Sequence, residues 1–82
     1  MGDRVLGNGA AELRRLTARE REVLELAAEG ARDAEIAHAF HVEVTTVKTH
    51  LRSCYRKLEV DGRMAATRVL LIDQKKIVRT ND

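Results

Sequence analysis

The amino-acid sequence predicts an all-α fold, a four-helix bundle made of short helices. Among its 82 residues there is no proline, and residues with good helix propensity dominate the chain. Hydrophobic residues make up 44% of the sequence and aromatic residues only 2%, so the core must be built from Leu, Val, Ile and Ala. A chain of this length forms one domain, and this composition favours packed helices over a sheet.

We divide the chain into a lead at residues 1–15, a domain at residues 16–76 and a polar tail at residues 77–82. The lead contains three glycines and little apolar pattern, which indicates a flexible linker, with a helical turn feasible near its end. No apolar run approaches the roughly 20 residues that span a bilayer, and the first residues lack the apolar stretch of a signal peptide. We therefore expect a cytoplasmic protein with no membrane partner, and the single cysteine fits a reducing compartment.

The first helix is predicted over residues 18–29. Thr17 precedes it and Glu20 follows three residues later, which is the capping-box pattern that satisfies two free backbone amides. Gly30 is placed to end this helix, because glycine adopts a left-handed backbone without strain. The apolar face of the helix consists of Val23, Leu24, Leu26 and Ala27.

A second helix is predicted over residues 33–40, with Asp33 as N-cap because Arg32 has no oxygen to accept an amide. Residues 41–43 break the pattern, and a third helix covers residues 44–58. Two short helices joined by a three-residue turn have the geometry of a helix-turn-helix. The side chains expected in the wedge between these helices are Ile36, Phe40, Val42, Val47 and Leu51, and the third helix should bury Val47, Leu51, Cys54 and Leu58.

A fourth helix begins near Arg63 and is expected to end between Asp73 and Lys76, after a turn at residues 59–62. It should bury Ala66, Val69 and Leu70. The apolar run Leu70, Leu71 and Ile72 is too wide for one buried stripe. Two explanations fit it equally, namely ordinary core with some exposed surface, or a dimer seam.

Positive charge is concentrated in residues 44–58, which hold four basic side chains and no acidic one, whereas residues 1–43 hold more acidic than basic side chains. Solvated helical faces usually mix both signs, as the first predicted helix does. A uniformly basic face on the second helix of a helix-turn-helix predicts contact with double-stranded DNA in the major groove. The side chains on this face are Lys48, Arg52 and Arg56, with Thr45 and Thr49 beside them, and Lys57 completes the basic set.

Several motifs occur in order and at consistent separations over about residues 16–70. They are Leu-Thr-Ala-Arg-Glu-Arg-Glu-Val-Leu at 16–24, Gly30, Glu35-Ile36-Ala37, Thr46-Val47-Lys48-Thr49-His50, Arg56-Lys57-Leu58 and Arg63-Met64-Ala65-Ala66. Together they resemble the LuxR-type (GerE-type) helix-turn-helix DNA-binding domain of bacterial transcription regulators. The resemblance implies a four-helix bundle that usually lies behind a phosphorylated receiver, as in a two-component response regulator, or behind a ligand-sensing domain.

The resemblance also implies roles for particular residues. Lys48, Thr49 and Arg52 would face base edges, while Arg56 and Thr46 would lie nearer the DNA backbone. A homodimer through the fourth helix, at residues 63–75, would bind inverted-repeat sites, and RNA polymerase is a further candidate partner.

Three positions depart from the family pattern. Glu43 stands where serine is common, and its carboxylate would repel a phosphate, so no backbone contact is expected there. Arg32 replaces a usual polar cap residue and becomes a candidate phosphate ligand. Glu59 stands where glycine often ends the third helix.

Two other classes of protein remain as alternatives. One is a sigma-factor-like domain that works with RNA polymerase, and the other is a helical protein-interaction or dimerisation module that touches no nucleic acid. An enzyme is not expected, because the sequence has no Gly-rich phosphate loop and too little chain to enclose a pocket. We therefore expect no catalytic residue, no cofactor and no small-molecule ligand in this segment.

A metal site is also not expected. His38, His41, His50 and Cys54 form no CxxC or HxxxH cluster. His50 is interpreted as a packing residue and Cys54 as a small core residue. Tyr55 either donates to a phosphate or covers the edge of the core, and the second role is favoured.

Overall fold

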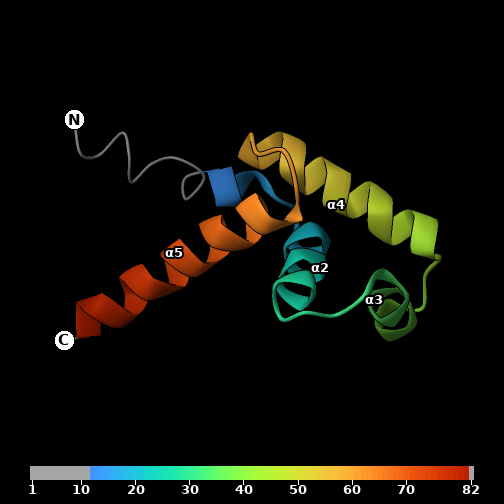
Figure 1. Ribbon diagram of the computed structural model, residues 1–82, viewed down its shortest axis with the longest axis horizontal. Coiled ribbons are helices and arrows are strands. Elements are labelled where there is room, and N and C mark those ends of the chain that lie inside the picture. Colours follow the sequence, from blue (N-terminus) through green and yellow to red (C-terminus); the bar gives the residue numbers. More distant parts are fainter. Residues whose placement is uncertain (1–11, 82) are drawn as a thin grey trace.

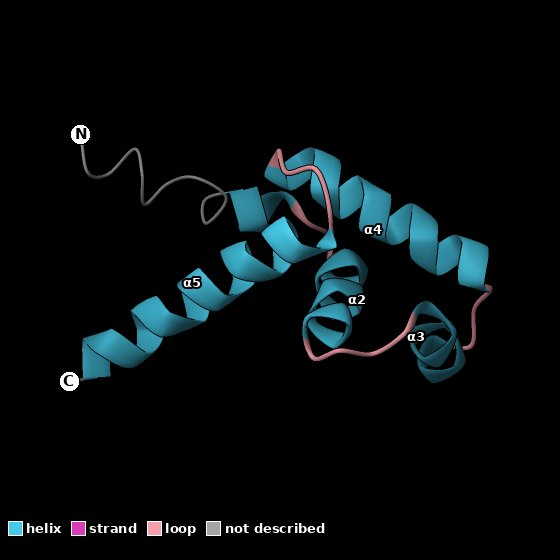
Figure 2. Ribbon diagram, viewed as in Figure 1, coloured by secondary structure: helices cyan, strands magenta, loops and turns pink. Residues whose placement is uncertain are grey.

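The computed structural model describes residues 12–81, with side chains described as far as Asp73. In this part of the chain all regular structure is helical, which confirms the predicted all-α fold (Figure 2). The elements are η1 (Glu12–Arg15, a 3-10 helix), α2 (Ala18–Ala28), α3 (Asp33–Phe40), α4 (Val44–Leu58) and α5 (Arg63–Asn81).

Helix α2 occupies the middle of the bundle and packs most extensively against α4 and α5 (Figure 1). Helix α3 packs mainly on α4, and α5 extends away from the other helices towards the C-terminus. The buried hydrophobic side chains come from η1 and from every α-helix, so one core joins all the elements. They are Leu13, Val23, Leu24, Ala27, Ile36, Ala37, Val47, Leu51, Cys54, Leu58, Ala66, Val69 and Leu70.

The apolar spacing predicted the core of α4 and α5 correctly. All four expected positions in α4 are buried, and so are the three expected in α5. Leu71 and Ile72 are instead 49% and 44% exposed, and Leu26 and Phe40 are only partly buried against the core. The outer part of the apolar run in α5 is therefore surface.

The bundle begins earlier than predicted. Residues 12–15 of the lead form η1, so the helical turn that was considered feasible near the end of the lead is present, but Leu13 is buried in the core beside α4 instead of belonging to a flexible linker. The N–H of Leu16 donates to the carbonyl of Leu13, which closes this turn before α2 begins. Leu13 and Leu16 are three residues apart, and this single pair is too short a pattern to have predicted that the lead packs on the core. The first 11 residues of the expected lead lie outside the described residues.

Helix α5 ends later than predicted. It continues to Asn81, whereas the sequence interpretation ended it between Asp73 and Lys76 and assigned residues 77–82 to a tail. The segment 74–81 contains neither glycine nor proline, so nothing in its residues interrupts the backbone hydrogen bonds. Asp82 lies outside the described residues.

The start of α2 matches the prediction and the start of α3 does not. The Thr17 hydroxyl accepts from the N–H of Glu20, and the Glu20 carboxylate accepts from the N–H of Thr17, which confirms the capping box. In α3 the N-cap is Arg32 and not Asp33. The backbone N–H of Arg32 itself donates to the Glu35 carboxylate at 2.7 Å, so this half of a capping box forms without a side-chain oxygen on residue 32.

Helices α2, α3 and α4 end in the same way, at a residue with left-handed backbone. These residues are Gly30 (φ 98°), His41 (φ 57°) and Glu59 (φ 59°). In each case its N–H donates to the carbonyl three residues back, and the next N–H donates to the carbonyl five back, which is the Schellman motif. The prediction that Gly30 ends the first helix is thus confirmed, and α4 ends at Glu59 without a glycine.

Candidate nucleic-acid interface

Helices α3 and α4 form the helix-turn-helix, with residues 41–43 as the turn. Ile36 and Val47 are fully buried between these helices, and Leu51 is nearly so. Phe40 and Val42 pack partly buried against the same core. The left-handed backbone of His41 reverses the chain, and Glu43 is the N-cap of α4 without a side-chain cap hydrogen bond. The crossing of the two helices is thus held by the residues expected in the wedge.

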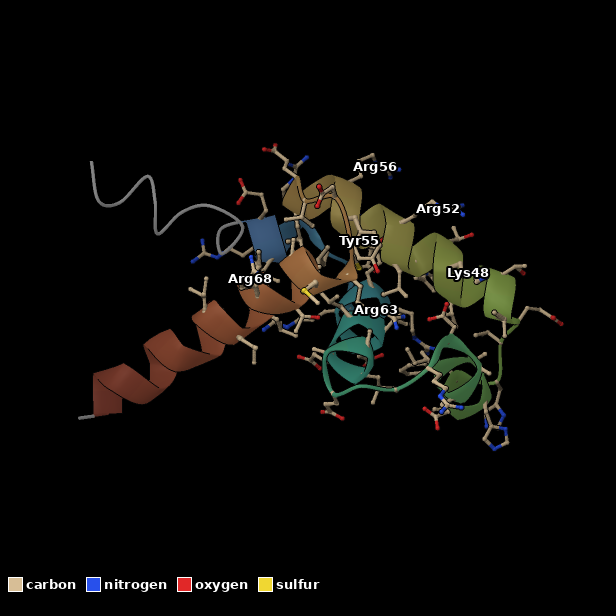
Figure 3. The ribbon with its side chains drawn as sticks, viewed as in Figure 1. Lys48, Arg52, Tyr55, Arg56, Arg63 and Arg68 are labelled. Atoms are coloured by element: carbon tan, nitrogen blue, oxygen red, sulfur yellow. The ribbon has the colours of Figure 1, made fainter. Side chains whose placement is uncertain are left out.

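The outer side of α4 carries a basic face, which we define as Lys48, Arg52 and Arg56. All three side chains are exposed and project from the same side of α4 (Figure 3). No ion pair within the described part of the chain includes any of them, although Arg56 Nη2 lies 3.5 Å from Ser53 Oγ. This face therefore presents positive charge that carboxylates of the described bundle leave unneutralised.

The threonines of α4 lie at its N-terminal end. Thr45 and Thr49 are exposed and Thr46 is partly buried. The Thr49 hydroxyl donates to the carbonyl of Thr45 at 3.0 Å, so its proton is used within the helix. The Thr49 side chain can still accept a hydrogen bond and make non-polar contact through its methyl group.

Lys57 does not belong to the basic face, although the sequence interpretation counted it among the free positive charges. Its Nζ lies 2.8 Å from Glu20 Oε1, and its side chain is only 26% exposed. Helix α4 therefore offers one positive charge fewer to a ligand than its sequence suggests, because Lys57 faces α2.

Glu20 is the buried partner of Lys57 and joins α2 to α4. Its carboxylate also accepts from Ser53 Oγ at 2.6 Å, in addition to its capping bond with Thr17. Burial by itself would raise the pKa of Glu20, but the hydrogen bonds from Lys57, Ser53 and Thr17 outweigh it and lower the pKa to about 2. Glu20 thus stays charged and holds the C-terminal half of α4 against the start of α2.

An open hollow of about 270 Å³ lies beside the basic face. Its lining comes from the N-terminal ends of α3 and α5 and from the middle of α4. Arg63 Nη2 donates to Asp33 Oδ1 across this hollow. Burial would lower the pKa of Arg63, but Asp33 and Tyr55 outweigh that effect and raise it. The lining residues are Asp33, Lys48, Leu51, Arg52, Tyr55 and Arg63.

Asp33 and Arg63 were not identified as site residues from the sequence. They are 30 residues apart and belong to different helices, so no local pattern connects them. Tyr55 is partly buried against the core, in agreement with the favoured interpretation of that residue. Arg32, the candidate phosphate ligand, is exposed at the start of α3.

The histidines and the cysteine are spread over the bundle. Within the described residues, no three His, Cys, Asp or Glu side chains gather as a metal-binding group. Cys54 is fully buried, its Sγ lies 3.4 Å from the carbonyl of Glu20, and burial raises the pKa of the thiol to about 11. Cys54 is thus a core residue, as predicted. None of the described helices combines the length and the apolar character that crossing a bilayer requires.

The fold and the basic face define a helix-turn-helix DNA-binding domain. Residues 14–70 match the family described as bacterial regulatory proteins, luxR family. The chain therefore belongs to the luxR family of bacterial regulatory proteins, as the motifs indicated.

The relatives that match are named as regulators. The chain is 44% identical over 61 residues to the putative HTH-type transcriptional regulator YhjB of Escherichia coli K12, covering 74% of this chain and 30% of that protein. It is 49% identical over 51 residues to the response regulator protein VraR of Staphylococcus aureus NCTC 8325, covering 62% of this chain and 24% of that protein. VraR of Staphylococcus epidermidis matches with the same identity and coverage. The matched segment spans less than a third of each of these relatives.

Proposed function

We propose that this chain binds double-stranded DNA sequence-specifically by inserting α4 into the major groove, as the output domain of a bacterial transcription regulator. The observation that carries this proposal is the basic face, where Lys48, Arg52 and Arg56 are exposed and unpaired within the described bundle on the second helix of the helix-turn-helix. Recognition helices occupy the groove in this way and read bases mainly with their N-terminal residues.

The position along α4 suggests a different role for each side chain. Lys48 and Arg52 donate to guanine O6 and N7, and the Thr49 methyl contacts a thymine methyl. Thr45, at the N-terminal end of α4, lies close to the bases as well. Arg56 and Thr46 contact phosphates, which set the register of the helix without reading sequence.

We further propose that the domain acts as a homodimer through α5 on an inverted-repeat site. Met64, Leu71 and Ile72 are 75%, 49% and 44% exposed. Met64 and Leu71 are seven residues apart and lie on the same side of α5, and Ile72 borders that side, about 100° further round the helix. Exposed apolar side chains grouped on one side of a helix are typical of an interface. Two-fold docking would place the two α4 helices about one DNA turn apart, roughly 34–36 Å.

The names and lengths of the relatives support one more step. VraR is named as a response regulator, and the matched segment is 24% of its length. We propose that the present domain likewise acts within a longer regulator, in which another domain receives the signal.

The test is fluorescence anisotropy with a random-sequence duplex pool at several salt concentrations. The wild-type protein should bind with an affinity that falls steeply with salt, and Lys48→Ala/Arg52→Ala should lose most of that binding. The matched control Arg14→Ala/Arg15→Ala removes two exposed charges from η1 and should retain it. Failure of the folded wild-type protein to bind at low salt would favour the protein-interaction module, whereas binding only with RNA polymerase core present would favour the sigma-factor-like alternative.

A further inference from the structure

Three cationic side chains and one carboxylate line the hollow beside the basic face. Lys48, Arg52 and Arg63 line it together with Asp33 and the Tyr55 side chain, and Leu51 lies at its buried side. Lys48 and Arg52 come from the helix proposed to enter the groove, while Arg63 comes from the start of α5 (Figure 3). The net charge of the lining is therefore positive, and its position borders the proposed DNA surface.

Arg63 is held in place but retains free donors. One guanidinium nitrogen donates to Asp33, and the side chain is still 39% exposed. A guanidinium has five N–H donors in a planar fork, so the remaining ones are available to a second anion. Because Asp33 already restricts the side chain, a ligand would order it at a smaller cost in conformational entropy.

We infer that this hollow receives a backbone phosphate of the DNA, with Arg63 as a phosphate ligand and Asp33 as the residue that positions it. A phosphate group has the bulk of only a few water molecules of about 30 Å³ each, so the hollow accommodates it. Planar bidentate donation suits two phosphate oxygens, and the Tyr55 side chain lines the hollow together with Arg63. This inference rests on the proposed function, because it adds a contact to the same DNA complex.

The competing explanation is that the Asp33–Arg63 pair only fastens α5 to α3. A phosphate ligand differs from a structural pair in its effect on counterion release, since each neutralised phosphate contributes about 0.9 to the slope of log K against log salt. The experiment therefore measures that slope on a random-sequence duplex and on a selected site for the variants Arg63→Gln, Arg63→Lys, Asp33→Asn and Arg68→Gln.

Arg63→Gln should lower affinity about tenfold at moderate salt and reduce the slope by about 0.9 on both duplexes. Arg63→Lys should keep the slope, because it keeps the charge. Asp33→Asn breaks the same pair without removing the cation and should also keep the slope. Arg68→Gln removes the same charge from the same helix at an exposed position outside the hollow, and should leave the slope unchanged.

An unchanged slope in Arg63→Gln would overturn the inference. Equal destabilisation of Arg63→Gln and Asp33→Asn would not alter that conclusion, because it reports only on the role of the pair in the fold. If Arg63→Gln does not fold, Asp33→Asn/Arg63→Gln replaces the ion pair with an amide pair and serves in its place. Wild-type protein without salt-sensitive binding would overturn the proposed function itself. Salt-sensitive wild-type binding that Lys48→Ala/Arg52→Ala abolishes, together with an unchanged slope in Arg63→Gln, would refute only the phosphate site.

Discussion

Lys57 and Glu20 form an ion pair between α4 and α2, with 2.8 Å between Nζ and Oε1, although 37 residues separate them. The same carboxylate caps α2 through Thr17 and accepts from Ser53. One acidic side chain thus connects the start of the bundle to the helix proposed to read DNA. Because of this pair, Lys57 supports the fold, whereas Lys48, Arg52 and Arg56 remain available to a ligand.

Glu20→Gln should destabilise the domain by about 3 kcal/mol, because it leaves Lys57 partly buried without its counter-charge. Urea unfolding followed by circular dichroism measures this change. The control Glu22→Gln removes an exposed carboxylate from the same helix, where its pair with Arg19 contributes less than about 1 kcal/mol. Equal losses in the two variants would contradict the assigned role of Glu20.

The stability of the domain should fall in acid because of Glu20. Its pKa is about 2 in the folded state against an ordinary value of 4.5, so the unfolded chain binds the proton more readily. The stabilisation is fully present above pH 4.5 and is lost as the pH falls towards 2. Urea midpoints measured between pH 2 and 6 should therefore decline in the wild-type protein and decline less in Glu20→Gln. Parallel curves for the two proteins would refute this assignment.

Glu59→Gly should stabilise the domain by about 1 kcal/mol. Glu59 adopts a left-handed backbone at the end of α4, which strains any residue with a Cβ atom. Glu29→Gly is the matched control, since Glu29 directly precedes the left-handed Gly30 and itself has a right-handed backbone, so this variant should lose up to about 1 kcal/mol. Thermal unfolding of both variants measures the difference, and changes of the same sign would be inconsistent with the strain at Glu59.

Arg56→Ala and Lys48→Ala should weaken DNA binding in different ways. Loss of a phosphate contact at Arg56 lowers affinity for all sequences and reduces the salt slope by about 0.9. Loss of a base contact at Lys48 costs about 1–3 kcal/mol on the preferred site and relaxes the preference at one base pair. Binding-site selection with each variant distinguishes the two roles, and a relaxed preference in Arg56→Ala would reverse the assignment.

Leu71→Glu should weaken dimerisation on an inverted repeat about tenfold or more, because it places a charge in the proposed apolar seam of α5. Leu71 is 49% exposed in the single chain, so the fold should tolerate the change. Analytical ultracentrifugation with whole-site and half-site duplexes measures it, and half-site binding should persist. Whole-site affinity equal to that of the wild-type protein would exclude this face as the seam.

The sequence by itself determined the helices and most of their ends. Helical spacing identified the buried side of α4, and the local pattern of Thr17 and Glu20 identified the cap of α2, because these signals act within one or two turns. Gly30 identified the end of α2 for the same local reason. The exposed basic side of α4 could be found in the same way, since a single helix contains it. The family motifs could be found because each of them is a short run of neighbouring residues.

Only the tertiary structure decided which charged side chains are free and which are paired within the fold. The partners Glu20 and Lys57, and Asp33 and Arg63, are 37 and 30 residues apart, so no helical period relates them. Leu13 became part of the core because η1 packs on α4, and its short local spacing with Leu16 does not specify the helix on which it packs. The physical reason is common to all three cases. Packing brings distant residues within a few ångströms, and burial and ion pairing depend on that distance and not on sequence pattern.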